Sequence, residues 1–173
     1  AAESLVLLKN EGSLLPLAAG SKVAVIGDFA KNPRYQGAGS SMVNSTQVDV
    51  LLDKLIDSEL NVIGYQQGFD RHGKPDAALQ KSACELATQA DTVILCMGLD
   101  EIAESEGLDR SNLRLAQNQV DLLQAVAVVN PKIVVVLYSG SVVETPWLDN
   151  CQALLYAALG GQAGAGAGAG GPN

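Results

Sequence analysis

Apolar and polar positions divide the chain into two kinds of block: short unbroken apolar runs, and longer segments with apolar residues at helical spacing. The runs are rich in β-branched residues, which is typical of strands buried on both faces of a sheet. They predict strands at 22–28, 61–65, 91–98, 132–137 and 153–159. The amphipathic segments predict helices at 1–8, 48–60, 76–89, 113–129 and 145–148. Strands alternating with helices at this spacing predict βαβ units with right-handed crossovers. The expected fold is therefore a doubly wound, mostly parallel α/β sheet of five to six strands, with helices on both faces.

Local signals set the ends of several elements. Asp76 is placed to cap the helix that follows it, and Asn130-Pro131 ends another, because the residue before a proline avoids the α region. A long segment rich in Gly, Pro, Asn and Ser follows the first predicted strand. Loops of that length in compact domains tend to be functional or disordered. We expect a linker and lead-in helix at 1–20, an α/β-sandwich domain at 21–160 and a Gly/Ala-rich tail at 161–173.

Composition fits a single globular domain. The chain has 173 residues, 47% of them hydrophobic, which is enough for one buried core and too few for two. A net charge of −8 argues against nucleic acid and anionic membrane partners, since both need a basic surface. No apolar run has the length needed to cross a bilayer. The first residues lack both a basic region and an initiator Met, so we expect the interior of a longer protein.

Cysteine and histidine positions argue against a metal site. Cys84, Cys96 and Cys151 lie far apart, and the single histidine, His72, falls in a polar loop. Structural zinc needs closely spaced ligands. We therefore predict no metal site and no disulfide framework, and interpret Cys84 and Cys96 as small buried apolar residues.

Two other chemistries lack the residues they need. The stretch 37–42, Gly-Ala-Gly-Ser-Ser-Met, has only two glycines of a dinucleotide fingerprint and lies well beyond the turn after its strand. No phosphate-binding Gly-Lys-Ser/Thr occurs, so we predict no cofactor. Ser139 is not in a Gly-x-Ser-x-Gly nucleophile elbow, and the histidine is distant in the sequence.

An acidic loop follows the strand predicted at 91–98. It contains Glu104, Glu106, Asp109 and Arg110 within seven residues. Open α/β sheets place working residues in such loops, and carboxylates there can transfer protons. The alternative is a solvated surface loop in which Glu106 or Asp109 caps the next helix and Arg110 pairs locally. Glycosidic chemistry needs two carboxylates, and this chain shows no obvious second one.

Five segments carry a resemblance that favours the first interpretation. The chain resembles the C-terminal α/β-sandwich domain of glycoside hydrolase family 3, the family of many β-glucosidases. The matching segments, in order along the chain, are 2–10 with 14–17, 23–27 with 34–41, 104–110, 146–147 and 160–162. The Ala-Gly tail departs from the family, because a helix and an Asn-Pro-Ser-Gly region usually follow there.

The resemblance implies part of a retaining, exo-acting β-glucosidase. A TIM-like barrel domain, absent from this chain, would carry the nucleophilic aspartate, so the chain alone would be inactive. Glu106 matches the acid/base position best, and Glu104 is the runner-up. Ser40 matches a position that contacts the bound sugar, with Arg34 and Gln36 as weaker matches. The substrate would be a β-linked glucoside or short oligosaccharide.

Two questions stay open at this point. The first is the pKa of Glu106: like charges on Glu104 and Asp109 would raise it, as acid catalysis requires, whereas Arg110 pointing inward would lower it. The second is a rival function, a non-catalytic sugar- or domain-binding module of flavodoxin-like fold that uses residues 34–41. That rival predicts measurable glucose affinity for the isolated chain.

Overall fold

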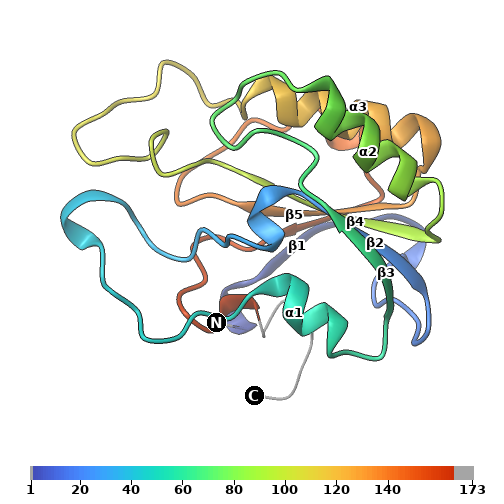
Figure 1. Ribbon diagram of the computed structural model, residues 1–173. Coiled ribbons are helices and arrows are strands. Elements are labelled where there is room, and N and C mark those ends of the chain that lie inside the picture. Colours follow the sequence, from blue (N-terminus) through green and yellow to red (C-terminus); the bar gives the residue numbers. More distant parts are fainter. Residues whose placement is uncertain (1, 166–173) are drawn as a thin grey trace.

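A six-stranded sheet forms the centre of the computed structural model, which describes residues 2–165 (Figure 1). The strand order is β1-β6-β5-β4-β2-β3, and every neighbouring pair is parallel except β1 with β6. The mostly parallel doubly wound sheet predicted from the sequence is thus confirmed. The strands are β1 Val6–Asn10, β2 Lys22–Ile26, β3 Asn61–Gln66, β4 Thr92–Gly98, β5 Ile133–Tyr138 and β6 Ala153–Tyr156.

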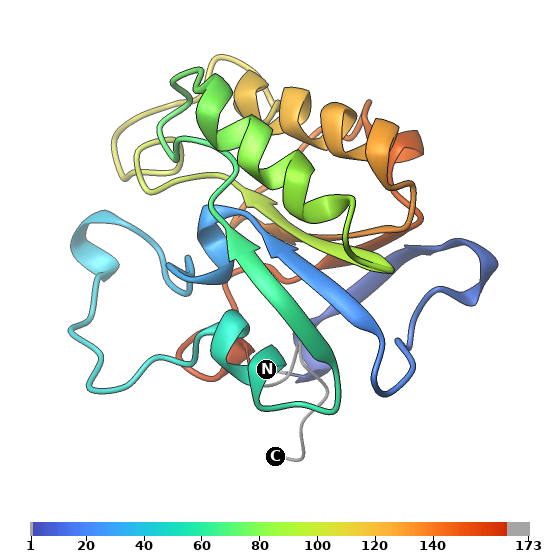
Figure 2. The same ribbon diagram turned by 45° about the vertical axis from the view of Figure 1, so that its right-hand side comes forward.

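Helices cover both faces of the sheet. In Figures 1 and 2, α2 (Ala77–Ala87) and α3 (Gln117–Val129) lie side by side over one face, and α1 (Leu51–Ile56) lies on the other. Asp76 caps α2 as predicted, because its carboxylate accepts hydrogen bonds from the backbone amides of Ala78 and Leu79. Short 3-10 turns complete the chain: η1 Ala2–Ser4, η2 Glu11–Ser13, η3 Asp28–Ala30, η4 Gly39–Ser41 and η5 Leu148–Asn150.

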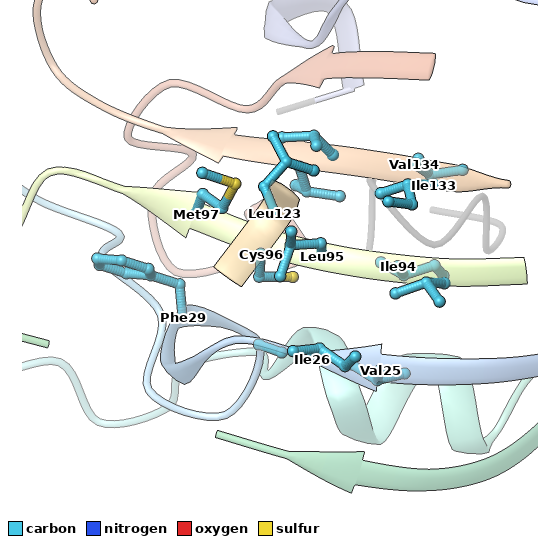
Figure 3. Close-up of a cluster of buried hydrophobic side chains, with 14 of the residues drawn as sticks. Val25, Ile26, Phe29, Ile94, Leu95, Cys96, Met97, Leu123, Ile133 and Val134 are labelled. Carbon is cyan, nitrogen blue, oxygen red and sulfur yellow. The ribbon is translucent and has the colours of Figure 1, made fainter. Parts of the chain in front are cut away.

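The core lies between the central strands and the helices. All residues of β4 and β5 are buried, as continuous apolar strands of a parallel sheet should be. Figure 3 shows side chains from β2, β4, β5 and α3 in one cluster, including Ile26, Leu95 and Leu123. Full burial of such a side chain stabilises the fold by about 1.5–3 kcal/mol. This rigid centre fixes the ends of the strands and therefore the bases of the loops that leave them.

The predicted lead-in helix at residues 1–8 is wrong. The structure has the single turn η1 and then the edge strand β1, which pairs with β6. The Lys9 ammonium also donates to the carbonyl oxygens of Leu148 and Cys151, at 3.0 and 2.7 Å. Partners about 140 residues away therefore decide the conformation of this segment, and its local helical spacing does not.

Three other predicted helices are shorter than expected. The segment 48–60 is helical only in α1, and 113–129 only in α3. The short helix predicted to begin at 145–148 is the single 3-10 turn η5, Leu148–Asn150. In the Gly/Ala-rich tail predicted at 161–173, residues from 166 onward lie outside the described part of the chain.

Candidate functional site

Three loops meet where the parallel strands end at their carboxyl termini. They follow β2 (27–50), β4 (99–116) and β5 (139–152), and the first two project from the same side of the molecule in Figures 1 and 2. Parallel strands end at a common edge, so loops far apart in the sequence come together there. Below, "acid loop" means residues 99–116.

Arg34 joins the first two loops from a buried position. It is 2% exposed, and its Nη1 donates to the carbonyl oxygen of Leu99 at 3.0 Å and to the carboxylate of Glu104. A buried guanidinium needs such a partner, because an unpaired charge in the interior is costly. The charged end of Arg34 is therefore directed at the base of the acid loop, and its sugar contact stays a prediction.

Both carboxylate oxygens of Glu104 are occupied by partners within the protein. Oε1 accepts from the Ser141 hydroxyl, and Oε2 accepts from Arg34 and, at 2.9 Å, from the Gly140 amide. Burial would raise the pKa of Glu104, but the hydrogen bonds from Ser141 and Gly140 and the Arg34 guanidinium outweigh it, so the pKa falls below its ordinary value. Glu104 is thus held as a carboxylate.

Glu106 has a different environment, although it lies two residues further along. Its side chain is exposed, and Oε2 accepts from the Ser40 hydroxyl at 2.6 Å and the Ser40 amide at 3.0 Å. Those two hydrogen bonds lower the pKa of Glu106, and they outweigh the small opposing effect of burial. Within residues 2–165, Oε1 of Glu106 has no hydrogen-bond partner. One oxygen is therefore free to meet a ligand.

The approach of Glu106 to Ser40 depends on Gly39. This glycine has φ +81°, and a Cβ built on it would lie 2.8 Å from Cβ of Glu106. Gln36 supports the same loop: its amide nitrogen donates to Val43 O and its amide oxygen accepts from Val43 N, at 3.1 and 3.0 Å. The polar atoms of Gln36 therefore hold its own loop, and its role toward a sugar stays a prediction.

The structure does not show the helix-capping alternative for the acid loop. The residue before α3 is Ala116, and no side chain caps the helix. Arg110 does not pair with the acids of its loop, because its Nη2 donates to Ser141 Oγ at 3.0 Å and Val142 O at 2.7 Å. Both ends of the loop tip are thus attached to the loop after β5.

Sequence reasoning missed a second anchor, centred on Arg71. Its guanidinium binds the carboxylates of Asp28 and Glu101 and lies 4.3 Å from the centroid of the Phe29 ring. Burial alone would lower the pKa of Arg71, but the neighbouring Glu101 and Asp28 outweigh burial and raise that pKa above its ordinary value. Burial alone would raise the pKa of Glu101, but the hydrogen bonds from Arg71 outweigh burial and lower that pKa. The signal was present in the sequence, since Asp28 and Glu101 follow adjacent strands and two such carboxylates need a cation.

Glu106 does not line the open depression on the surface near Arg71. An open depression of about 440 Å³ is lined by Arg71, Glu101, Tyr35 and Lys31, among others, and Glu106 lies outside it. In the described part of the chain, no three His, Cys, Asp or Glu side chains are grouped as metal ligands. No helix among those residues is long and apolar enough to cross a membrane.

The doubly wound sheet with helices on both faces is that of an α/β-sandwich domain. The chain belongs to the glycosyl hydrolase family 3 C-terminal domain, whose profile matches residues 5–170. This confirms the family resemblance found in the sequence.

Relatives and solved structures agree with that assignment. The chain is 42% identical to thermostable β-glucosidase B of Acetivibrio thermocellus, over 94% of this chain and 22% of that protein. It is 43% identical to an exo-α-(1→6)-L-arabinopyranosidase of Bifidobacterium breve, over 95% of this chain and 23% of that protein. The crystal structure of a Bifidobacterium adolescentis family 3 β-glucosidase superposes with a TM-score of 0.91 at 47% identity, over 96% of this chain and 24% of that one. This chain therefore spans about a quarter of the length of these relatives.

Proposed function

We propose that this chain is part of a retaining, exo-acting β-glucosidase, in which Glu106 is the general acid/base. The rest of the active site, including the nucleophilic aspartate, would come from a TIM-like barrel domain outside this chain. The observation that carries the proposal is the position of the Glu106 carboxylate, which is exposed at the carboxyl edge of the sheet with one oxygen unpaired. The family assignment and the β-glucosidases among the relatives support it.

The surroundings of the two glutamates favour Glu106 over Glu104. A general acid must present a protonated oxygen within hydrogen-bond reach of the leaving group. Glu104 uses both oxygens inside the protein, one of them against the buried Arg34 guanidinium, which stabilises the charged form. Protonating Glu104 would break that arrangement. Protonating Glu106 would break no ion pair, because its only hydrogen-bond partner within residues 2–165 is Ser40.

The proposed cycle uses both protonation states of Glu106. The protonated acid donates to the glycosidic oxygen while the aspartate forms a covalent glycosyl-enzyme. The resulting carboxylate then takes a proton from the water that hydrolyses this intermediate. In the complete site we expect the two carboxyl groups to lie roughly 5–5.5 Å apart, the separation typical of retaining enzymes.

The proton-donor role requires a change at Ser40. In this chain the Ser40 hydrogen bonds favour the carboxylate and lower the pKa of Glu106. Enclosure by the barrel and substrate would remove water, which raises the pKa of a carboxyl group. Release of the Ser40 hydroxyl, which could then contact the sugar, would act in the same direction.

The test is Glu106→Ala in the complete enzyme, with two substrates that differ in leaving group. Cellobiose, whose leaving group needs a proton, should be turned over about 10²–10⁴-fold more slowly. With a 2,4-dinitrophenyl β-glucoside the rate of the glycosylation step should fall much less. Added azide should restore turnover by attacking the glycosyl-enzyme to form a β-glucosyl azide. Unchanged cellobiose turnover would refute the assignment.

The isolated 173-residue chain gives a second measurement. It should hydrolyse neither substrate and should bind glucose too weakly to detect by calorimetry, because it lacks the barrel. Clear glucose binding that depends on residues 34–41 would instead support the binding-module function. Assays with β-glucosides and α-L-arabinopyranosides in parallel would distinguish between the activities named for the two relatives.

A further inference from the structure

The tip of the acid loop is attached to the rest of the domain at two points, one on each side of Glu106. Glu104 lies two residues before it and Arg110 four residues after it. Both side chains reach the same atom, Oγ of Ser141, which donates to Glu104 Oε1 and accepts from Arg110 Nη2 at 3.0 Å. Below, "tip anchors" means Glu104 and Arg110.

The segment between the tip anchors has few other restraints. Gly107 has φ +78°, and a Cβ built on it would find no atom within 4 Å. Leu108 is 60% exposed, and Asp109 is exposed too. Among the described residues, the Glu106 side chain forms hydrogen bonds only with Ser40, which belongs to another exposed turn. A backbone hydrogen bond from Leu108 N to Ser105 O, at 3.2 Å, closes the turn around Glu106, and the tip anchors connect that turn to the rest of the domain.

One tip anchor continues into the interior. The Glu104 side chain is 9% exposed, and the Arg34 side chain that pairs with it is 1% exposed. Arg34 also holds the start of the acid loop through Leu99 O. An ion pair in this position is a rigid reference point, because separating it would leave a charge unpaired in the interior.

We propose that Glu104 is a positioning residue for the acid/base. Through Arg34 on one side and Ser141 on the other, it fixes the distance between the Glu106 carboxyl group and the glycosidic oxygen. This inference rests on the proposed role of Glu106. The two glutamates have different roles: Glu104 stays ionised and holds the acid loop in position, and Glu106 transfers the proton.

These separate roles predict how the loss of Glu104 would change the kinetics. A misplacement of about 1 Å can cost up to roughly 100-fold in rate. The loss should appear in kcat for substrates that need a proton donor, with KM little changed. For a substrate with a good leaving group kcat should fall far less, because departure of that group does not need a proton from Glu106. A defect of folding alone would lower both activities in the same proportion.

The experiment compares four variants of the complete enzyme on cellobiose and on a 2,4-dinitrophenyl β-glucoside. Glu104→Gln keeps the shape and removes the charge, and Ser141→Ala removes the atom that both tip anchors share while leaving Arg34 paired. Glu106→Gln reports the acid/base itself. Glu85→Gln is the matched control, because Glu85 forms a solvent-exposed ion pair with Lys81 on α2, outside the acid loop.

We expect kcat on cellobiose to fall roughly 10–100-fold in Glu104→Gln and several-fold in Ser141→Ala. The dinitrophenyl substrate should retain most of its rate, and the control should match the wild type. Azide should yield glucosyl azide with Glu106→Gln only, since the tip variants still carry the acid/base. Thermal melts of each variant would show that the comparison is between folded proteins.

Each contrary result has a distinct meaning. If Glu106→Gln is impaired but Glu104→Gln and Ser141→Ala are not, the positioning role is wrong and the proposed function stands. If azide rescues Glu104→Gln and not Glu106→Gln, Glu104 is itself the acid/base, and both ideas fail. Equal losses on the two substrates in Glu104→Gln and Ser141→Ala would reduce Glu104 to a stabilising residue.

Discussion

Replacing Gln119 by Met should destabilise the chain more than its place on a helix suggests. Gln119 is 1% exposed, and its amide forms two hydrogen bonds of 2.9 Å, one to the N–H and one to the C=O of Gly98. Gly98 is the last residue of β4, where the neighbouring strand β2 no longer pairs, since the last β2–β4 pair is Ile26 with Leu95. The Gln119 side chain supplies the hydrogen bonds that β2 does not.

The cost follows from those two bonds. Met has nearly the volume of Gln, so the substitution removes the bonds and leaves little cavity. A buried backbone group without a partner costs about 1–3 kcal/mol, so the two groups of Gly98 cost about 2–6 kcal/mol together. For a chain of this size each kcal/mol lowers Tm by about 2–4 °C, which gives a fall of roughly 4–24 °C.

Urea denaturation of the 173-residue chain, followed by far-UV circular dichroism, measures the free energy of unfolding. Gln117→Met is the matched control: Gln117 begins the same helix, is exposed, and donates a hydrogen bond of 2.8 Å to the carboxylate of Asp121. It should change stability by less than about 0.5 kcal/mol. The reasoning would be refuted if the two variants unfolded at the same urea concentration, since the hydrogen bonds from Gln119 to Gly98 would then not contribute to stability.

Two further predictions concern titration and thiol reactivity. The native pKa of Glu104 lies below its ordinary value of 4.5, so this group stabilises the fold above that pH and ceases to do so as the pH falls through its native pKa. The free energy of unfolding should therefore decline less steeply from neutral pH to about pH 3 in Glu104→Gln, and identical slopes would contradict this. Burial raises the pKa of the Cys151 thiol to about 11 and that of Cys96 much further, whereas Cys84 is only half-buried. Iodoacetamide followed by mass spectrometry should label Cys84 first and Cys96 only after unfolding, so early labelling of Cys96 would show that the described core opens.

The sheet could be predicted because its signal is local. Ile133–Tyr138 is an unbroken apolar run, and such a run satisfies a strand buried on both faces whatever its neighbours are. The edge strand β1 has no such signal, because three of its residues are exposed and its order comes from pairing with β6. Local spacing there favoured a helix, and hydrogen bonds to distant residues decided the outcome.

The acid loop could be located from the sequence, but its attachments could not. An acidic stretch directly after a buried strand marks the carboxyl edge of a sheet, which is how 104–110 was found. The partners of its two glutamates are Arg34, Ser40 and Ser141, each more than 30 residues away. Nothing in the sequence assigns Arg34 to Glu104 and Ser40 to Glu106, and the family resemblance pointed Arg34 and Ser40 toward the sugar instead.

The opposite surroundings of these two glutamates bear on how the complete enzyme would work. In this chain the pKa values of both are lowered, by hydrogen bonds from Ser141 and Gly140 and by the buried Arg34 for Glu104, and by Ser40 for Glu106. Because the ion pair of Glu104 with Arg34 is internal, we expect the docking of another domain to leave it unchanged. The exposed Glu106 carboxyl group loses water when a domain covers it, and its pKa then rises. On the proposed function, the docking step that brings the nucleophile also raises the pKa of Glu106 and makes it a proton donor. Glu104 stays ionised in the same step and keeps the acid loop in position.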